Sequence, residues 1–190
     1  MKKIIWPLLL CLLLCGCGGG ETGSAVQEQY RTVRTAQLEA EVTSHTDTDS
    51  RTFTLRCRYD AAGDSVTTVT APGELAGLSV IVSGEDMTLS CDGLQLPAGA
   101  SLDICPANCL PYLLRALAEG YVLEVGEETL EDTPCRRLTL DTTDADGEKV
   151  VCTVWLAEED PVYAELSREG KLLLSVRFTA FQQTESDGGE

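Results

Sequence analysis

Alternation of apolar and polar residues is the feature of this sequence that most constrains its fold. It is clearest where Phe53, Leu55, Cys57 and Tyr59 alternate with threonine and arginine. Successive side chains of a β-strand point to opposite faces of a sheet, so this period of two predicts a strand with one buried face. Similar patterns, separated by turn residues, predict consecutive antiparallel strands over 38–43, 52–59, 66–70, 78–82, 87–91, 121–125, 135–141, 149–156, 162–166 and 172–181.

An early segment departs from this alternation and has the spacing of a helix. Ser24 and Gln27 form a capping-box pattern, which is typical of a helix start. Val26 and Tyr30 follow at intervals that place them on one helical face. The sequence therefore predicts a short amphipathic helix from residue 25 to about residue 36.

A second helix is predicted after a long irregular stretch. Asn108 is a suitable N-cap, and Pro111 falls in the first turn, where a missing N–H is tolerated. Gly120 is a natural stop after the last turn. The apolar stripe of this helix comprises Leu110, Leu113, Leu114 and Leu117.

These elements predict an α+β fold of mostly antiparallel β-structure. A sheet with a continuous apolar face must cover that face, and two short helices are the only covers available. We expect a twisted, half-open β-barrel with one N-terminal helix and one inserted lid helix. Two alternatives stay open for its apolar face, which either lines a ligand cavity or packs as a closed core. The candidate ligand-binding residues are Phe53, Leu55, Leu78, Val80, Met87, Leu89, Leu113, Leu114, Leu117, Leu174, Val176 and Phe178.

The first 16 residues have the features of a targeting segment. Lys2 and Lys3 precede an apolar run of about 11 residues, roughly half of what a membrane-spanning helix needs. The run ends in Leu14-Cys15-Gly16-Cys17, which resembles the lipobox of bacterial lipoproteins. An ordinary cleaved secretory signal is the alternative interpretation.

The lipobox interpretation divides the chain into four parts. We predict a signal peptide over 1–16, a lipidated Cys17 within a flexible tether over 17–24, one folded domain over 25–182 and a polar tail over 183–190. A diacylglyceryl group on Cys17 would hold the domain on the extracytoplasmic face of the cell membrane.

Charge and motif content exclude several classes of function. The chain has 31 acidic and 14 basic residues, a net charge of −17, which argues against binding nucleic acid. It has a single histidine and no GxSxG, HExxH or P-loop motif, so we predict neither enzyme activity nor a cofactor. Asp144, Asp146 and Gly147 resemble part of a calcium loop, but a hairpin turn explains them better, and no metal site is predicted.

Six cysteines lie in the predicted domain, namely Cys57, Cys91, Cys105, Cys109, Cys135 and Cys152. An even number in an exported protein makes them candidates for structural disulfides. Cys57 and Cys91 fall on apolar strand faces, where burial as small hydrophobic side chains is the alternative. Cys105 and Cys109 are spaced CxxxC rather than CxxC, so a redox or zinc site is disfavoured.

Several stretches, in order, resemble the LolA/LolB-like superfamily of half-open barrels. Residues 71–80 (APGELAGLSV) are similar to its entry into a strand, and 91–96 (CDGLQL) to its strand that ends in a glycine turn. Residues 155–165 (WLAEEDPVYAE) are similar to its Trp-Leu hairpin, and 178–181 (FTAF) to its closing Phe-x-x-Phe. The resemblance covers about residues 38–182.

The resemblance implies a non-catalytic, membrane-anchored lipoprotein that binds an acyl chain, lipid or lipoprotein in a hydrophobic cavity. Within the superfamily, the chain is most similar in character to the GerS-like envelope lipoproteins of Gram-positive bacteria. That branch implies an alternative function, in which the cavity is filled and the protein docks an envelope protein partner. Fold alone does not choose between these functions.

Overall fold

The computed structural model of the chain describes residues 19–185, with side chains over 23–183. The predicted signal peptide, the predicted lipidation site at Cys17 and residues 186–190 lie outside the described residues. The elements are α1 (Gly19–Thr32), β1 (Val33–His45), β2 (Ser50–Asp60), β3 (Ser65–Ala71), the 3-10 turn η1 (Gly73–Leu75), β4 (Ser79–Ser83), β5 (Asp86–Cys91), β6 (Leu94–Ala100), α2 (Cys109–Glu119), β7 (Tyr121–Leu130), β8 (Thr133–Thr143), β9 (Lys149–Ala157), β10 (Asp160–Arg168) and β11 (Lys171–Glu185).

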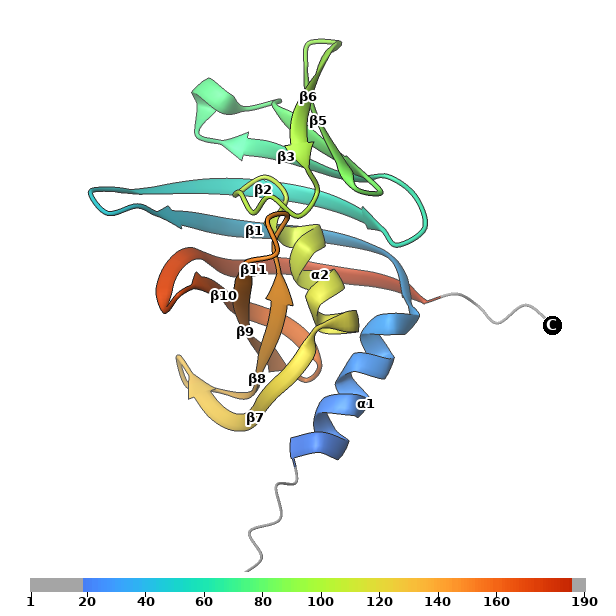
Figure 1. Cartoon of the computed structure of the whole chain (residues 1–190), viewed down its shortest axis with the longest axis vertical. Helices are drawn as coiled ribbons and strands as arrows, with labels where there is room; N and C mark the ends of the chain where they lie inside the picture. Colours follow the sequence, from blue (N-terminus) through green and yellow to red (C-terminus); the bar gives the residue numbers. More distant parts are fainter. Residues whose placement is uncertain (1–18, 186–190) are drawn as a thin grey trace, which may run out of the picture.

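The eleven strands of residues 19–185 form one antiparallel sheet in the order β6-β5-β4-β3-β2-β1-β11-β10-β9-β8-β7. The chain builds the sheet outward from β1 to the edge strand β6, and then outward from β11 in reverse, starting at the other edge strand β7. Helix α2 joins the two edges and therefore crosses the open side of the curved sheet (Figure 1). The predicted half-open α+β barrel with two helices is thus confirmed.

One face of the sheet is mainly apolar from edge to edge, with Ser65 and Thr67 of β3 as buried polar residues on it. Directly opposed residues on paired strands share a face, so the register traces each row of side chains. One row links Val125, Leu138, Val154, Ala164 and Val176 across β7 to β11. Val176 opposes Val42, which opposes Phe53, and the same face continues into β3, β4, β5 and β6.

The two helices fill the concavity of the sheet. The apolar side of α2 presents Leu110, Leu113 and Leu117, each at most 1% exposed. Val26 and Tyr30 of α1 join the same buried cluster. Figure 1 shows both helices on one side of the sheet, with α2 nearer its middle. The main core of the protein therefore lies between α2 and the concave face.

The first helix differs from its prediction. It begins at Gly19 and ends at Thr32, so it takes in most of the predicted tether and stops before residue 36. A Cβ at Gly23 would lie 3.1 Å from Val122 Cγ1 and from Val125 Cγ2, so glycine allows the helix to approach β7 closely here. The helix stops early because Val33 already pairs with β11.

The second helix lies where it was predicted, over Cys109–Glu119. The backbone N–H of Gly120 donates to the carbonyl of Ala116 (2.8 Å), and a Cβ at Gly120 would lie 2.6 Å from that oxygen. Gly120 therefore ends α2 through its small size, with a negative φ of −62° instead of the left-handed conformation of a typical glycine stop.

The hairpin turn predicted at Asp144, Asp146 and Gly147 is present in the structure. The side-chain Oδ1 of Asp144 accepts hydrogen bonds from the backbone N–H groups of Asp146 (3.0 Å) and Glu148 (2.8 Å), which confirms a hairpin turn there. The segment 168–171 also connects two paired strands, β10 and β11. Strand β11 continues to Glu185, beyond the predicted end of the domain.

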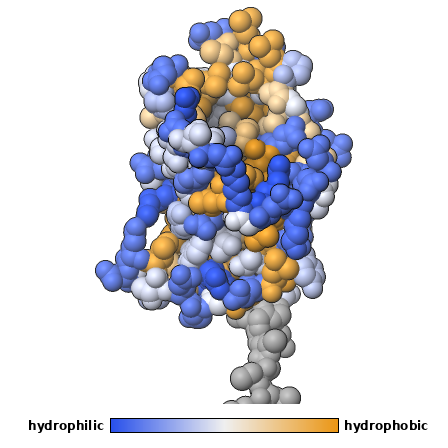
Figure 2. Space-filling view, turned by 60° about the vertical axis from the view of Figure 1, so that its left-hand side comes forward, coloured by the Kyte–Doolittle hydropathy of each residue, from blue (hydrophilic) through white to orange (hydrophobic). Residues whose placement is uncertain are grey.

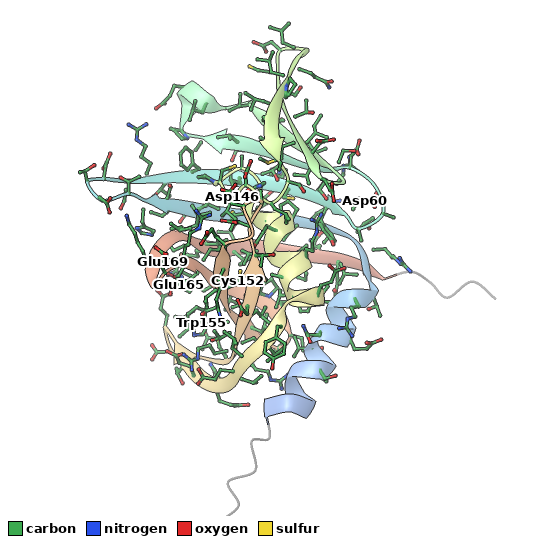
Figure 3. The ribbon with its side chains drawn as sticks, in the orientation of Figure 1. Asp60, Asp146, Cys152, Trp155, Glu165 and Glu169 are labelled. Carbon is green, nitrogen blue, oxygen red and sulfur yellow. The ribbon has the colours of Figure 1, made fainter. Side chains whose placement is uncertain are left out.

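Trp155 lies on the face of β9 opposite to Val154, outside the barrel. Its Nε1 donates to Glu128 Oε2 (3.1 Å), and its ring packs against Tyr163 at a centroid distance of 5.3 Å (Figure 3). On the convex side of the sheet, Trp155 therefore links β9 to Glu128 of β7 and to Tyr163 of β10. Within residues 19–185, neither helix has the length and apolar character that crossing a membrane requires.

Replacing Leu117 with alanine tests whether α2 is part of the core. The side chain is 1% exposed, so Leu117→Ala is expected to lower the free energy of unfolding by about 2–5 kcal/mol. Urea denaturation followed by circular dichroism measures this. The control Leu94→Ala removes a side chain that is 72% exposed and should change stability by less than about 0.5 kcal/mol. Equal, small effects of both substitutions would contradict a packed α2.

Candidate binding surface

All twelve predicted ligand-binding residues lie on the concave side, but the structure divides them between two clusters. The main core includes Leu55, Leu113, Leu114, Leu117, Leu174 and Val176, with Phe53, Leu78 and Phe178 packed against it. A smaller cluster under β4 and β5 contains Val80 and Met87, with Leu89 packed against it. The sequence analysis placed all twelve on one apolar face, either as a cavity lining or as a closed core, and did not predict their division into two clusters.

The six predicted residues in the main core are almost fully enclosed. Each is at most 3% exposed, because α2 covers this part of the concave face and packs against α1, β8 and β2. Figure 3 shows side chains crowding the space between α2 and the sheet, with Cys152 labelled among them. For these residues, the structure favours the closed core over an open cavity.

The pockets of the described region lie around this core, and charged residues contribute to their walls. A pocket of about 240 Å³ between the end of α1 and the β2–β3 hairpin is lined by Arg31, Asp60, Arg115 and Glu119 among others. Another, of about 210 Å³, lies between α2 and β8 and includes Arg115 and Asp141. Of the twelve predicted residues, Phe53 alone lines one of these five pockets of the described region, one of about 270 Å³ beside Pro106. The pocket at the end of α1 has a mainly polar lining and therefore suits a small polar molecule better than an acyl chain.

The concave face continues past α2 without a cover. Val80 opposes Leu89, and Leu89 opposes Leu96, so the three form one row across β4, β5 and β6. Exposure rises along this row, from 5% at Val80 to 61% at Leu96, and Leu94 is 72% exposed. We call Leu89, Cys91, Leu94 and Leu96 the apolar rim. Figure 2 shows orange side chains gathered at the top of the molecule and continuing downward into a hollow.

Strand β6, which carries half of the apolar rim, was missed in the sequence. Pro97 and Gly99 interrupt it, and its alternation is limited to Leu94, Gln95 and Leu96. The Asp92-Gly93 pair carries the signal that could have found it. Both residues have positive φ, 48° and 79°, as the tight turn of a two-residue hairpin requires.

The segment between β6 and α2 explains why the cover ends before the apolar rim. The side chain of Asn108 is buried, and its Nδ2 donates to the carbonyls of Ser101 (3.0 Å) and Asp103 (2.7 Å). Its Oδ1 accepts from the N–H of Cys105 (2.9 Å), and its Nδ2 lies 3.1 Å from Met87 Sδ. Asn108 was predicted as a helix N-cap, but its side chain makes no capping bond and instead holds this segment over the Met87 end of β5.

The half of the sheet that carries the apolar rim is acidic. Residues 59–114 contain no lysine, arginine or histidine. The same range contains seven acidic residues: Asp60, Asp64, Glu74, Glu85, Asp86, Asp92 and Asp103. The apolar rim is therefore flanked by negative charge that no cation from its own strands neutralises.

The six cysteines of the domain are all free thiols in the structure. Cys57, Cys109, Cys135 and Cys152 are buried, so burial is the alternative that the structure supports for Cys57. Cys91 was predicted on an apolar face as well. It lies there, but it is exposed because β5 extends beyond the helix cover.

Burial also makes the inner thiols poor nucleophiles. It raises the pKa of Cys57 to about 11 and that of Cys152 to about 12. It raises the pKa of Cys109 well above its usual range, and the nearby Cys105 adds to this effect. At neutral pH these groups are protonated, which is the form of a structural rather than a reactive cysteine.

No protein-family model matches the sequence, and no curated protein matches it. Among solved structures, an uncharacterized conserved protein from Thermus thermophilus has a TM-score of 0.51 at 11% identity over 87% of each chain. A LolA superfamily protein from Nitrosomonas europaea has a TM-score of 0.46 at 13% identity, over 86% of this chain and 94% of its own. Lipoprotein LppX from Mycobacterium tuberculosis has a TM-score of 0.45 at 12% identity, over 89% of this chain and 96% of its own.

At 11–13% sequence identity, such similarities concern the fold alone and carry no information on ligand or activity. The sheet order and the two helices confirm the half-open barrel predicted from the sequence. The further similarity to GerS-like lipoproteins stays a prediction.

The thiols give a direct test of burial. In folded protein at pH 8, iodoacetamide should label the exposed Cys91 before Cys57, which is buried and has a raised pKa. Cys109 and Cys152 should react only after denaturation. Mass spectrometry of tryptic peptides measures the order. Labelling of Cys57 as fast as Cys91 would contradict the structure. So would a protein mass lower by two hydrogens, because that loss indicates a disulfide between two of the six cysteines.

Proposed function

We propose that the chain is a non-catalytic lipoprotein of the cell envelope, anchored through Cys17, whose LolA-like domain binds an apolar partner at the apolar rim. The lipobox pattern ahead of the domain supports the anchor. Helix α1 begins two residues after Cys17, so the domain would follow its anchor closely.

The observation that carries the proposal is the uncovered part of the concave face. Leu94 and Leu96 are 72% and 61% exposed, side by side on an edge strand, where a soluble protein usually places polar residues. Fully burying a leucine contributes roughly 1.5–3 kcal/mol, so covering the pair offers about 2–4 kcal/mol before association costs.

The filled interior supports a protein partner over an acyl chain. A chain inside the barrel would have to displace α2 and expose Leu113, Leu114 and Leu117, all at most 2% exposed. The function that the geometry supports best is therefore the alternative predicted above, docking of an envelope protein by a half-barrel whose cavity is filled. Binding of a lipid or lipoprotein acyl chain is the second candidate, favoured by the leucine-rich character of the rim.

The anchor is tested by metabolic labelling of the host cells with an alkyne fatty acid. We expect label on the wild-type protein and none on Cys17→Ser, because the sulfur of Cys17 is the attachment site. Cys15→Ser is the matched control and should keep its label. Label retained on Cys17→Ser, or lost only from Cys15→Ser, would refute Cys17 as the anchor.

The filled interior is tested by native mass spectrometry of residues 18–190, purified without detergent. We expect the mass of the free protein, with no retained phospholipid or fatty acid, since α2 occupies the space that such a ligand would need. A stoichiometric lipid adduct that survives purification would instead establish the carrier function.

A further inference from the structure

The two edges of the sheet are protected differently. At one edge, β7 packs against α1, where Gly23 meets Val122 and Val125. At the other edge, β6 packs mainly against β5 and projects from the top of the molecule (Figure 1). Every residue of β6 from Leu94 to Gly99 is exposed. The outer side of β6 is therefore a free strand edge.

A free edge offers backbone N–H and C=O groups to any extended segment that approaches it. Proteins usually block such edges with charged side chains, proline or bulges. In β6, Pro97 and the register shift opposite Met87 and Thr88 block the second half only. The first half, Leu94-Gln95-Leu96, has neither charge nor proline and has its two leucines on the concave side.

We propose that β6 is a docking strand, to which an extended peptide segment of a protein partner adds as a twelfth strand. This inference rests on the proposed function and names the partner of the same surface. Backbone hydrogen bonds to the first half of β6 set the register of the peptide. Its alternate apolar side chains cover Leu96 and Leu94 and continue the apolar row from Val80 and Leu89.

The acidic residues around β6 indicate which side chains the peptide carries at the positions that do not cover Leu94 and Leu96. The half of the sheet around β6 has acidic residues and no basic ones over residues 59–114. Asp92 lies in the turn that leads into β6, and Asp86 pairs with Ala100 at its far end. A partner with lysine or arginine between its apolar residues is therefore attracted over about 10 Å at 0.1 M salt.

The same charge argues against a second copy of the chain as the occupant. Two copies joined through β6 would bring identical acidic surfaces together, each from a chain of net charge −17. Repulsion between like charges in an interface is unfavourable, and contact between the leucines of two copies does not remove it. The peptide is therefore a segment of a different, basic protein.

The test uses the mature lipidated protein in nanodiscs and a fluorescent peptide of alternating valine and lysine. Two control peptides are matched to it, one with glutamate for lysine and one with N-methyl groups on the central valines. Anisotropy should show binding of the valine–lysine peptide alone, because glutamate is repelled and N-methylation removes the backbone donors.

The protein variants locate the site. Leu94→Ser/Leu96→Ser should weaken binding of the valine–lysine peptide at least tenfold, and both side chains are exposed enough for the fold to persist. Leu123→Ser is the matched control, because Leu123 is a 45% exposed leucine on the opposite edge strand, β7. It should leave binding unchanged.

Several results would overturn the proposal. Equal binding of the N-methylated peptide would exclude strand addition, and equal binding by Leu94→Ser/Leu96→Ser would exclude β6. If the wild-type protein is a dimer and Leu94→Ser/Leu96→Ser is a monomer, a second copy of the chain, and not a basic peptide, binds at β6.

Binding of laurate, a fatty acid, tests the apolar rim as a binding surface separately from the peptide inference. If laurate binds at the rim, is lost in Leu94→Ser/Leu96→Ser, and the peptide does not bind, the peptide inference fails and binding at the rim stands. If neither binds, both fail.

Discussion

One mainly apolar face spans the eleven strands of residues 19–185, and the rest of the structure depends on how it is covered. The alternation in the sequence gives every strand a face that must leave water. Within the described residues two α-helices are available for this, and of the two α2 supplies the leucines that fill the middle of the concavity. The cover ends at β5, so Met87 is still buried there, whereas Cys91 of β5 and the two leucines of β6 stay exposed.

The connectivity explains where the cover lies. Because α2 links the edge strand β6 to the edge strand β7, it has to cross the open side of the half-barrel. Its position is then fixed from both ends, by the buried Asn108 before it and by Gly120 after it. A helix held in this way is a core element, and the exposed apolar residues of the concave face lie at the rim of the sheet.

The sequence predicts those features that follow from local periodicity. The strands around Phe53 and Leu55 and the helix around Leu113 lie where their patterns place them. It does not predict whether a face is covered, because coverage depends on the volume of α2 relative to the concavity. For the same reason Cys91 has the pattern of a buried residue but is exposed, and Leu113 is a core residue instead of a cavity lining.

The role of α2 is measured most directly by hydrogen–deuterium exchange of the folded protein. If α2 is part of the core, its amides from Leu113 onward exchange as slowly as those of the central strands β1 and β11, through global unfolding. The edge strand β6 should exchange much faster. Exchange of α2 at the rate of β6, with β1 and β11 still protected, would mean that α2 opens as a lid, and would contradict a filled half-barrel.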